Sequence, residues 1–280
     1  MSRLTQLFAE RAEIEGAELP EQVMSSVIAR LQRESRRGKT AEQKMQFFLS
    51  RRKINSVEAV RDLHCQGLLE PIGTTFPAGF RILVKKQTNA ERMRFTIAHE
   101  ICHTFFYEFV PELKFAPHDR DSDEERLCDV GAAELLMPAT SVRRAARSMP
   151  VCLESLERLA NQFVVSLAAM FLRLRSLRLW RCELSEWHRM MNGTFVLERS
   201  YGGKRLAWEW EEKSILRTAW KSNKGAFGHT FVRYEGVGGV QYFKPTQYEV
   251  RRLGERVLAL WGANIESSGN RYPLFDGGCS

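Results

Sequence analysis

A predicted helix that carries two histidines four residues apart constrains this chain more than any other feature of its sequence. The motif is His99-Glu100-Ile101-Cys102-His103, an HExxH pattern. On an α-helix, residues four apart lie on one face, about 6 Å from each other, so both imidazoles can bind a single Zn²⁺. Glu100 lies about 100° around the helix from His99. Its carboxylate can therefore reach a water at the open metal position and act as general base.

The residues on either side of the motif are typical of a buried helix. Thr88-Asn89-Ala90-Glu91 predicts a capping box at its start, and Pro111 predicts its end. Between them, apolar side chains surround most of the helix circumference. Two core histidines satisfied by hydrogen bonds are the alternative to a metal site. The next segment of the sequence favours the metal site.

A second predicted helix can supply the third protein ligand that a catalytic zinc needs. Ser122 and Glu125 fit a capping box at its start, and Pro138 predicts its end. Glu125 and Asp129 are four residues apart and share a face. With Glu125 as the ligand, Asp129 can accept the outer N–H of a ligating histidine. The alternatives are that Glu124 is the ligand and Glu125 only caps the helix, or that both are solvated. The acidic partner at i+4 favours Glu125.

Two stretches of sequence together resemble the ImmA/IrrE family of bacterial regulatory zinc metallopeptidases, and in detail its IrrE branch. They are RFTIAHE, residues 94–100, and ERLCDVGAAELLMP, residues 125–138; the similarity covers roughly residues 70–180. The resemblance implies that His99, His103 and Glu125 bind one Zn²⁺ and that Glu100 is the base. It also implies a site-specific protease that cleaves a helix-turn-helix transcriptional repressor and so switches on a stress or mobile-element response. Many relatives have glycine where this chain has Cys102.

Other residues near the motif have weaker claims to a role. His118 and Tyr107 are candidates for stabilising the transition-state oxyanion, although a loop histidine such as His118 is more often solvated. Cys102 and Cys128 lie on the two site helices and are a candidate redox pair. Buried cysteine, however, usually behaves as a small hydrophobic residue.

The net charge of +8 is distributed unevenly along the chain. Residues 118–134 contain seven acidic residues against two arginines, and this concentration of carboxylates beside the predicted metal favours a divalent cation. Residues 139–185 contain eight arginines against three acidic residues. Within them, apolar residues recur at helical spacing from Leu153, break at Phe163 to Val165 and resume after Ser166, a good N-cap. This pattern predicts a helix-turn-helix-like pair, with Leu167 to Arg178 as its second helix.

Arginines at positions 173, 175 and 178 of this pair suggest contact with DNA phosphates. They fall on more than one face of the helix. We therefore favour a packing role beside the protease core, with at most weak DNA contact. The competing hypothesis is a non-catalytic transcriptional regulator that binds DNA or sequesters a repressor around a structural zinc. An HExxH motif with an open fourth ligand position favours the enzyme, because structural zinc sites are usually closed by four protein ligands.

We predict an α+β fold in three parts. Residues 1–140 form a zincin-like metallopeptidase domain with a small antiparallel sheet and a helical N-terminal extension. Residues 141–185 form the helix-turn-helix-like segment, and residues 186–280 form a C-terminal α+β module. The resemblance implies a GAF-like sensory domain in this last position. No sequence feature predicts its ligand or the oligomeric state.

Local patterns predict individual elements within these parts. Gln22 to Leu31 and Ser56 to Leu69 are amphipathic and helical in character, and Phe80 to Lys86 predicts a strand just before the metal helix. In zincins such a strand commonly pairs with the extended substrate backbone. After residue 186, glycine-separated short strands precede a predicted helix from Tyr248 to Trp261.

The sequence also predicts a cellular compartment. It contains no apolar run long enough to span a bilayer and begins without a signal-peptide core. Its six cysteines are scattered without CxxC spacing, as expected for reduced thiols. We therefore expect a cytoplasmic protein with no membrane contact.

Overall fold

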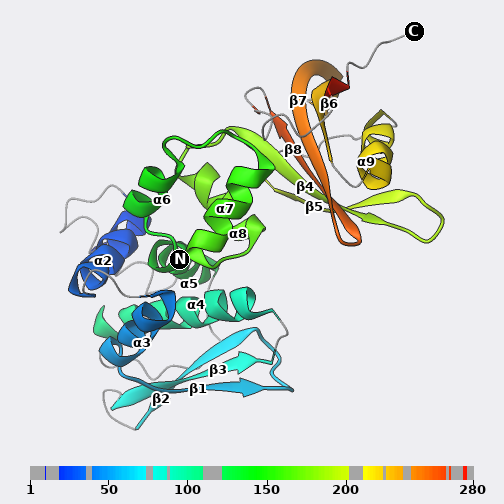
Figure 1. Cartoon of the computed structure of the whole chain (residues 1–280). Coiled ribbons are helices and arrows are strands. Elements are labelled where there is room, and N and C mark those ends of the chain that lie inside the picture. The colour runs from blue at the N-terminus through cyan, green and yellow to red at the C-terminus, as the bar shows by residue number, and fades with distance from the viewer. Residues whose placement is uncertain are drawn as a thin grey trace. The chain divides into compact units, whose positions relative to one another are not determined.

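The computed structural model (Figure 1) describes residues 10, 19–35, 40–73, 78–86, 89–109, 122–201, 211–222, 225–235, 241–262, 265 and 274–275. The chain divides into two compact units. The first contains Met1–Ala139 and Phe163–Ser166, and the second contains Thr140–Gln162 and Leu167–Ser280. None of the described helices is long and apolar enough to cross a membrane. The predicted boundaries at residues 140 and 185 and the GAF-like character of the last part stay predictions.

The first unit is built from a small sheet and the helices that cover it. Its elements are α2 (Pro20–Glu34), α3 (Ala41–Arg51), β1 (Ile54–Val60), β2 (Gly67–Ile72), β3 (Gly79–Lys85), α4 (Ala90–Phe109) and α5 (Ser122–Leu136). The predictions of α2, β3, α4 and α5 are confirmed. α4 contacts β2 and β3, and α5 contacts both α4 and α2 (Figure 1). The mixture of helices and small sheets confirms the α+β fold class.

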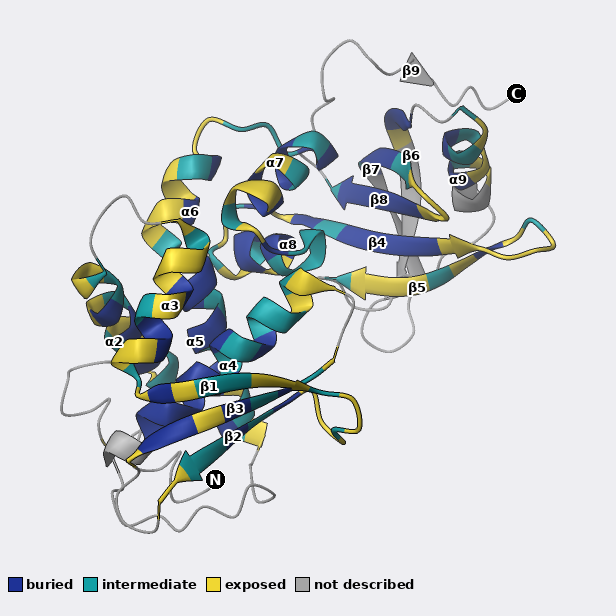
Figure 2. Ribbon diagram, turned by 60° about the horizontal axis from the view of Figure 1, so that its bottom comes forward, coloured by how far each residue is buried: buried dark blue, intermediate teal, exposed yellow. Residues whose placement is uncertain are grey.

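The sheet has the strand order β1-β3-β2, so the predicted strand, β3, lies at its centre. β2 and β3 form an antiparallel hairpin, whereas β1 runs parallel to β3. The sheet is therefore mixed rather than antiparallel, because the chain passes from β1 to the far edge before β3 fills the middle. Alternate residues of β3, namely Phe80, Ile82 and Val84, are buried. Figure 2 shows the buried colour along this strand. This alternation is what one packed face of a sheet requires.

The prediction that Ser56 to Leu69 is helical is wrong. This stretch contributes most of β1 and the start of β2. Residues of β1 are mainly half-buried or exposed, so the spacing of their apolar side chains does not distinguish a strand from a helix. Hydrogen bonding to the central strand β3 decides their conformation, which is a tertiary effect that local propensity does not reveal.

The ends of the two site helices agree largely with the predicted signals. The side chain of Asn89 accepts a hydrogen bond from the backbone N–H of Arg92, at 2.9 Å, and so caps α4. Thr88 and Pro111, which we predicted as its cap and its stop, lie outside the described residues. α5 begins at Ser122 and ends at Leu136, two residues before Pro138.

The second unit combines four described helices with a six-stranded sheet. Its elements are α6 (Ala139–Ala146), α7 (Leu153–Phe163), α8 (Leu167–Ser176), β4 (Cys182–Arg189), β5 (Phe195–Tyr201), α9 (Glu211–Ser222), β6 (Ala226–Glu235), β7 (Gln241–Leu253), β8 (Arg256–Gly262) and β9 (Leu274–Phe275). The strand order is β5-β4-β8-β7-β6-β9. The helix pair α7 and α8 confirms the predicted helix-turn-helix-like segment. Leu216 and Ala219 of α9 pack into the core of this sheet.

The predicted helix from Tyr248 to Trp261 is also wrong, because this segment forms the end of β7 and most of β8. The two strands pair antiparallel around Gly254, whose φ of 59° suits glycine in a tight turn. One face of the two strands contributes Tyr248, Val250, Val257, Ala259 and Trp261 to the core of the sheet. β8 is buried without a break from Val257 to Trp261. A continuous buried run does not distinguish a strand from a buried helix by periodicity, and pairing of β8 with β4 and β7 selects the strand.

Candidate metal centre

Helices α4 and α5 bring His99, His103 and Glu125 to one point. The Nε2 atoms of His99 and His103 are 3.1 Å apart. One carboxylate oxygen of Glu125 lies 3.1 Å from Nε2 of His99, and the other lies 3.4 Å from Nε2 of His103. Two ring nitrogens and the carboxylate of Glu125, each able to donate a lone pair to a cation, therefore face the same small space.

These separations fit a zinc ion. With metal–ligand bonds of about 2.0–2.1 Å, a tetrahedral zinc site places its ligand atoms about 3.3 Å from each other. Two imidazole nitrogens and one carboxylate are also the ligand set of glutamate-type catalytic zinc sites, which leave the fourth position free. The residues present therefore fit the zinc that the sequence predicts.

The outer nitrogens of both imidazoles are held by carboxylates. Nδ1 of His99 lies 2.9 Å from Oδ1 of Asp129, as predicted, and Nδ1 of His103 lies 2.7 Å from Oε1 of Glu124. A carboxylate accepts, so each Nδ1 donates and each Nε2 can present its lone pair toward the metal position. Glu124, which we considered only as an alternative ligand, thus contacts His103 from the outside. The sequence shows an acidic residue at position 124, but it does not show that His103 is its partner.

The same carboxylates stabilise positive charge at this point. Burial by itself lowers the pKa of His99, but hydrogen bonds to Asp129 and Glu125 outweigh burial and raise it to about 9. Burial raises the pKa of Glu125, yet its hydrogen bonds to His103 and His99 dominate and hold that pKa well below its usual range. A site that stabilises imidazolium in this way also favours a bound cation.

Glu100 is buried, with 2% of its surface exposed, and strand β2 packs closely against it. A Cβ placed on Gly67 would lie 2.6 Å from Oε1 of Glu100 and 2.5 Å from Cγ2 of Thr96. The absence of a side chain at Gly67 therefore lets β2 approach the carboxylate of the predicted base. We had not identified Gly67; a glycine within a strand is the signal that could have revealed a close approach.

We expect Gly67→Ala to displace the Glu100 carboxylate, because the added methyl group would overlap it. Peptidase activity should fall by about tenfold or more, whereas zinc content should stay at the wild-type level. Steady-state cleavage and elemental analysis measure the two quantities. Ile72→Ala, at the exposed end of the same strand, is the matched control. Unchanged activity in Gly67→Ala would show that Glu100 adjusts freely and that this contact is unimportant.

Cys102 of α4 fits because a glycine lies opposite it on α5. A Cβ on Gly131 of α5 would lie 2.6 Å from the sulfur of Cys102 and 3.0 Å from two atoms of Met24. The small residue on α5 thus accommodates the larger one on α4. Burial raises the pKa of both the Cys102 and the Cys128 thiol well above its usual range, which leaves both uncharged.

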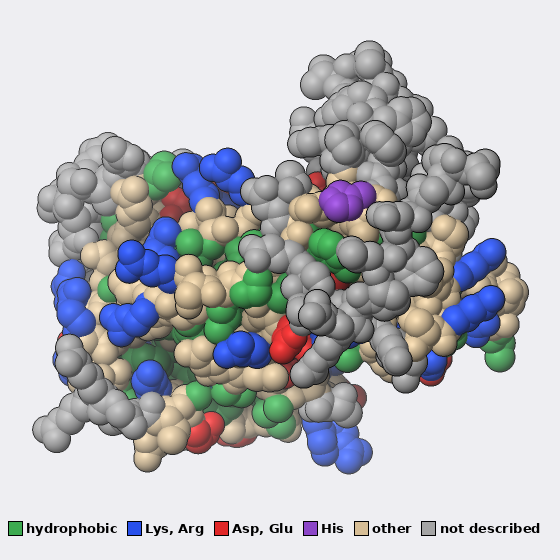
Figure 3. Space-filling model, turned by 45° about the horizontal axis from the view of Figure 1, so that its top comes forward, with side chains coloured by type: hydrophobic (Ala, Val, Ile, Leu, Met, Phe, Trp, Pro, Cys, Tyr) green, Lys and Arg blue, Asp and Glu red, His purple; other side chains and the backbone are tan. Residues whose placement is uncertain are grey.

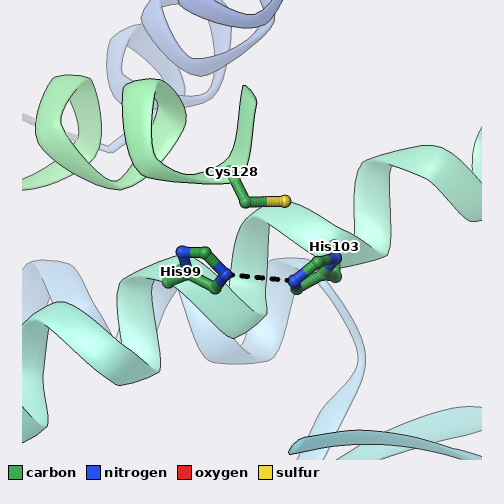
Figure 4. Close-up of side chains that lie close together, drawn as sticks. All are labelled: His99, His103 and Cys128. Atoms are coloured by element: carbon green, nitrogen blue, oxygen red, sulfur yellow. Dashed lines mark hydrogen bonds between the residues drawn. The ribbon is translucent and has the colours of Figure 1, made fainter. Parts of the chain in front are cut away.

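Cys128 of α5 also lies near the two histidines. One ligand atom from each of His99, His103 and Cys128 lies within 4.8 Å of the other two (Figure 4). The oxygens of Glu125 are much closer to both imidazole nitrogens, at 3.1 and 3.4 Å. On distance, Glu125 is therefore the better candidate for the third ligand. His118 and the side chain of Tyr107 lie outside what the structure describes, so their predicted roles stay predictions.

Comparison with known proteins defines the class to which this site belongs. Residues 71–175 match the IrrE N-terminal-like domain of peptidase family M78. This part of the chain is therefore similar to the metallopeptidase domain of the ImmA/IrrE family. It contains α4, α5, β3 and both members of the helix pair.

A curated relative and a solved structure are also similar to this chain. The radiation response metalloprotease IrrE of Deinococcus deserti is 40% identical over 72 residues, which cover 24% of this chain and 26% of that protein. The match thus spans about a quarter of the relative's length. A Mycobacterium tuberculosis transcriptional regulator superimposes with a TM-score of 0.46 and 15% identity, over 85% of this chain and 87% of that chain.

Proposed function

We propose that this protein is a zinc-dependent, site-specific endopeptidase that cleaves a helix-turn-helix transcriptional repressor. The observation that carries the proposal is the convergence of His99, His103 and Glu125 on one point. The buried residue Glu100 follows His99 directly in the sequence. A catalytic zinc protease needs these parts: three protein ligands, a free position and a general base.

The residues of the site have separable tasks in this proposal. His99, His103 and Glu125 would hold the zinc, which when bound acts as a Lewis acid toward the scissile carbonyl and acidifies a water. Glu100 takes the proton of the attacking water and later delivers it to the leaving amine. Asp129 and Glu124 hold the two imidazoles in the tautomer and orientation that metal binding requires.

Two further observations support a regulatory role in the cytoplasm. The similar stretch of the Deinococcus deserti protein belongs to a metalloprotease that its name assigns to the radiation response. For this chain we propose likewise a regulatory protease, one that cleaves a transcriptional regulator. The cysteines of the described part of the chain are all free thiols, as expected in a reducing compartment.

The helix pair α7 and α8 offers little support for the alternative, a DNA-binding regulator. Arg173 is buried, with 8% of its surface exposed, and Arg175 donates a hydrogen bond to the carbonyl of Cys182 at 2.6 Å. The turn between the helices is also engaged, since Arg94 of α4 donates to the carbonyl of Val164 at 2.7 Å. Basic side chains on the face drawn in Figure 3 are scattered rather than gathered in one stripe. We therefore expect at most weak, salt-sensitive DNA contact.

The test is cleavage of a candidate repressor by the purified, zinc-loaded protein. The first candidate is a small helix-turn-helix protein encoded beside this one. We expect two fragments produced by one cut, identified by mass spectrometry, and no cut after the zinc is removed with a chelator. A repressor that binds tightly but stays intact in the zinc-loaded reaction would favour sequestration over proteolysis.

A further inference from the structure

The thiol of Cys128 lies at the candidate metal centre beside the residues already assigned to it. Cys128 follows Glu125 by three residues on α5, so the two share a helix face. It is fully buried. Its sulfur and a ring nitrogen of each histidine lie within 4.8 Å of one another, and Figure 4 shows the sulfur on the side of α5 that faces both imidazoles.

The surroundings of Cys128 differ from those of Cys102, the other buried cysteine on these helices. The sulfur of Cys102 packs against the backbone of α5 at Gly131, where it fills space. Cys128 instead lies beside ligand-type groups, with a ring nitrogen of His99 and one of His103 within 4.8 Å of its sulfur. A cysteine that only fills a core has no need of such neighbours. Its position is that of a metal ligand.

We propose that Cys128 is a fourth, displaceable protein ligand that closes the metal centre when no substrate is bound. This inference rests on the proposed function only in taking the cation to be the zinc of the protease. In a tetrahedral site, a sulfur lies about 3.5 Å from ligand nitrogens. A sulfur now within 4.8 Å of both imidazoles thus needs to move by about 1 Å, through a small rotation of a short side chain.

Closure by Cys128 would make the resting protein latent. Four protein ligands are typical of structural zinc sites, and they leave no position for the attacking water. When the thiol binds, its proton passes to solvent and the sulfur donates an electron pair to the cation. When substrate enters, the sulfur takes a proton back and leaves, which restores the open position. Cys128 would therefore set how readily the protease becomes active.

Cobalt(II) loading of the full-length protein tests this assignment without reference to activity. A thiolate bound to cobalt(II) gives a charge-transfer band in the near ultraviolet, which histidine and carboxylate ligands do not give. We expect the band in wild-type protein loaded with one equivalent of cobalt(II). Cys128→Ala should lose the band yet keep the visible bands of bound cobalt(II), and Cys102→Ala, the matched control, should retain both. Cys128→Ser replaces the alanine variant if the latter does not fold.

Three results would overturn the proposal. They are the lack of a charge-transfer band in wild-type protein with bound cobalt(II), a band that persists in Cys128→Ala, and failure of the protein to bind cobalt(II) at all. The zinc form of Cys128→Ala should cleave the repressor faster than the wild-type protein does, and an equal or slower rate would contradict the latency that we propose. A band that depends on Cys128, together with no cleavage by either protein, would refute the proposed function while leaving the ligand assignment intact.

Discussion

Glu100→Gln is expected to reduce repressor cleavage by at least about a hundredfold, because the variant lacks the base that takes the proton from the attacking water. Glutamine has the size and helix propensity of glutamate, so the tightly packed space beside Gly67 should accommodate it. Zinc content and repressor binding should stay at wild-type levels. Single-turnover cleavage, elemental analysis and a binding assay measure the three quantities separately.

Glu134→Gln is the matched control for this substitution. Glu134 is also buried on a site helix, and its Oε1 accepts a hydrogen bond from the backbone N–H of Ala139, at 3.1 Å. Glutamine can still accept this bond, and the residue lies outside the catalytic machinery, so cleavage should continue. If Glu100→Gln cleaved the repressor at the wild-type rate, Glu100 would not be the base.

His103→Ala is expected to lose most of its zinc, because it removes one of three protein ligands from a buried site. Glu125→Ala should do the same if Glu125 is the third ligand. Elemental analysis after dialysis, and competition with a chromophoric chelator, measure zinc content and affinity. His188→Ala, which changes an exposed histidine of β4, should retain all its zinc.

The carboxylates that contact the outer ring nitrogens, Asp129 and Glu124, should affect zinc binding less than the ligands do. Asp129→Asn and Glu124→Gln remove only the charge of a hydrogen-bond partner, so each should weaken zinc binding by about 10–100-fold rather than abolish it. A loss in Glu124→Gln as large as that in His103→Ala, with little loss in Glu125→Ala, would identify Glu124 as the ligand instead. Full zinc retention by both His103→Ala and Glu125→Ala would refute the site.

Elements were predicted correctly where their signals are local. The caps and prolines around α5, the amphipathic pattern of α2 and the β-rich run of β3 each reflect the residues of that segment alone. The failures at residues 56–69 and 248–261 have a common cause. Both stretches mix apolar and polar residues in a way compatible with more than one period, and pairing with neighbouring strands selects the extended conformation.

The sequence by itself determined that His99 and His103 can share one metal ion, because the geometry of a single helix places residues i and i+4 on one face whatever surrounds them. It also placed acids on the following helix. Only the tertiary structure decided which acid meets which nitrogen. Glu124 and Glu125 are neighbours that point about 100° apart, so the rotation of α5 against α4 chooses between them. That rotation is set by packing between the helices, including the close approach of Gly131 to Cys102. The sequence of either helix taken alone does not determine this rotation.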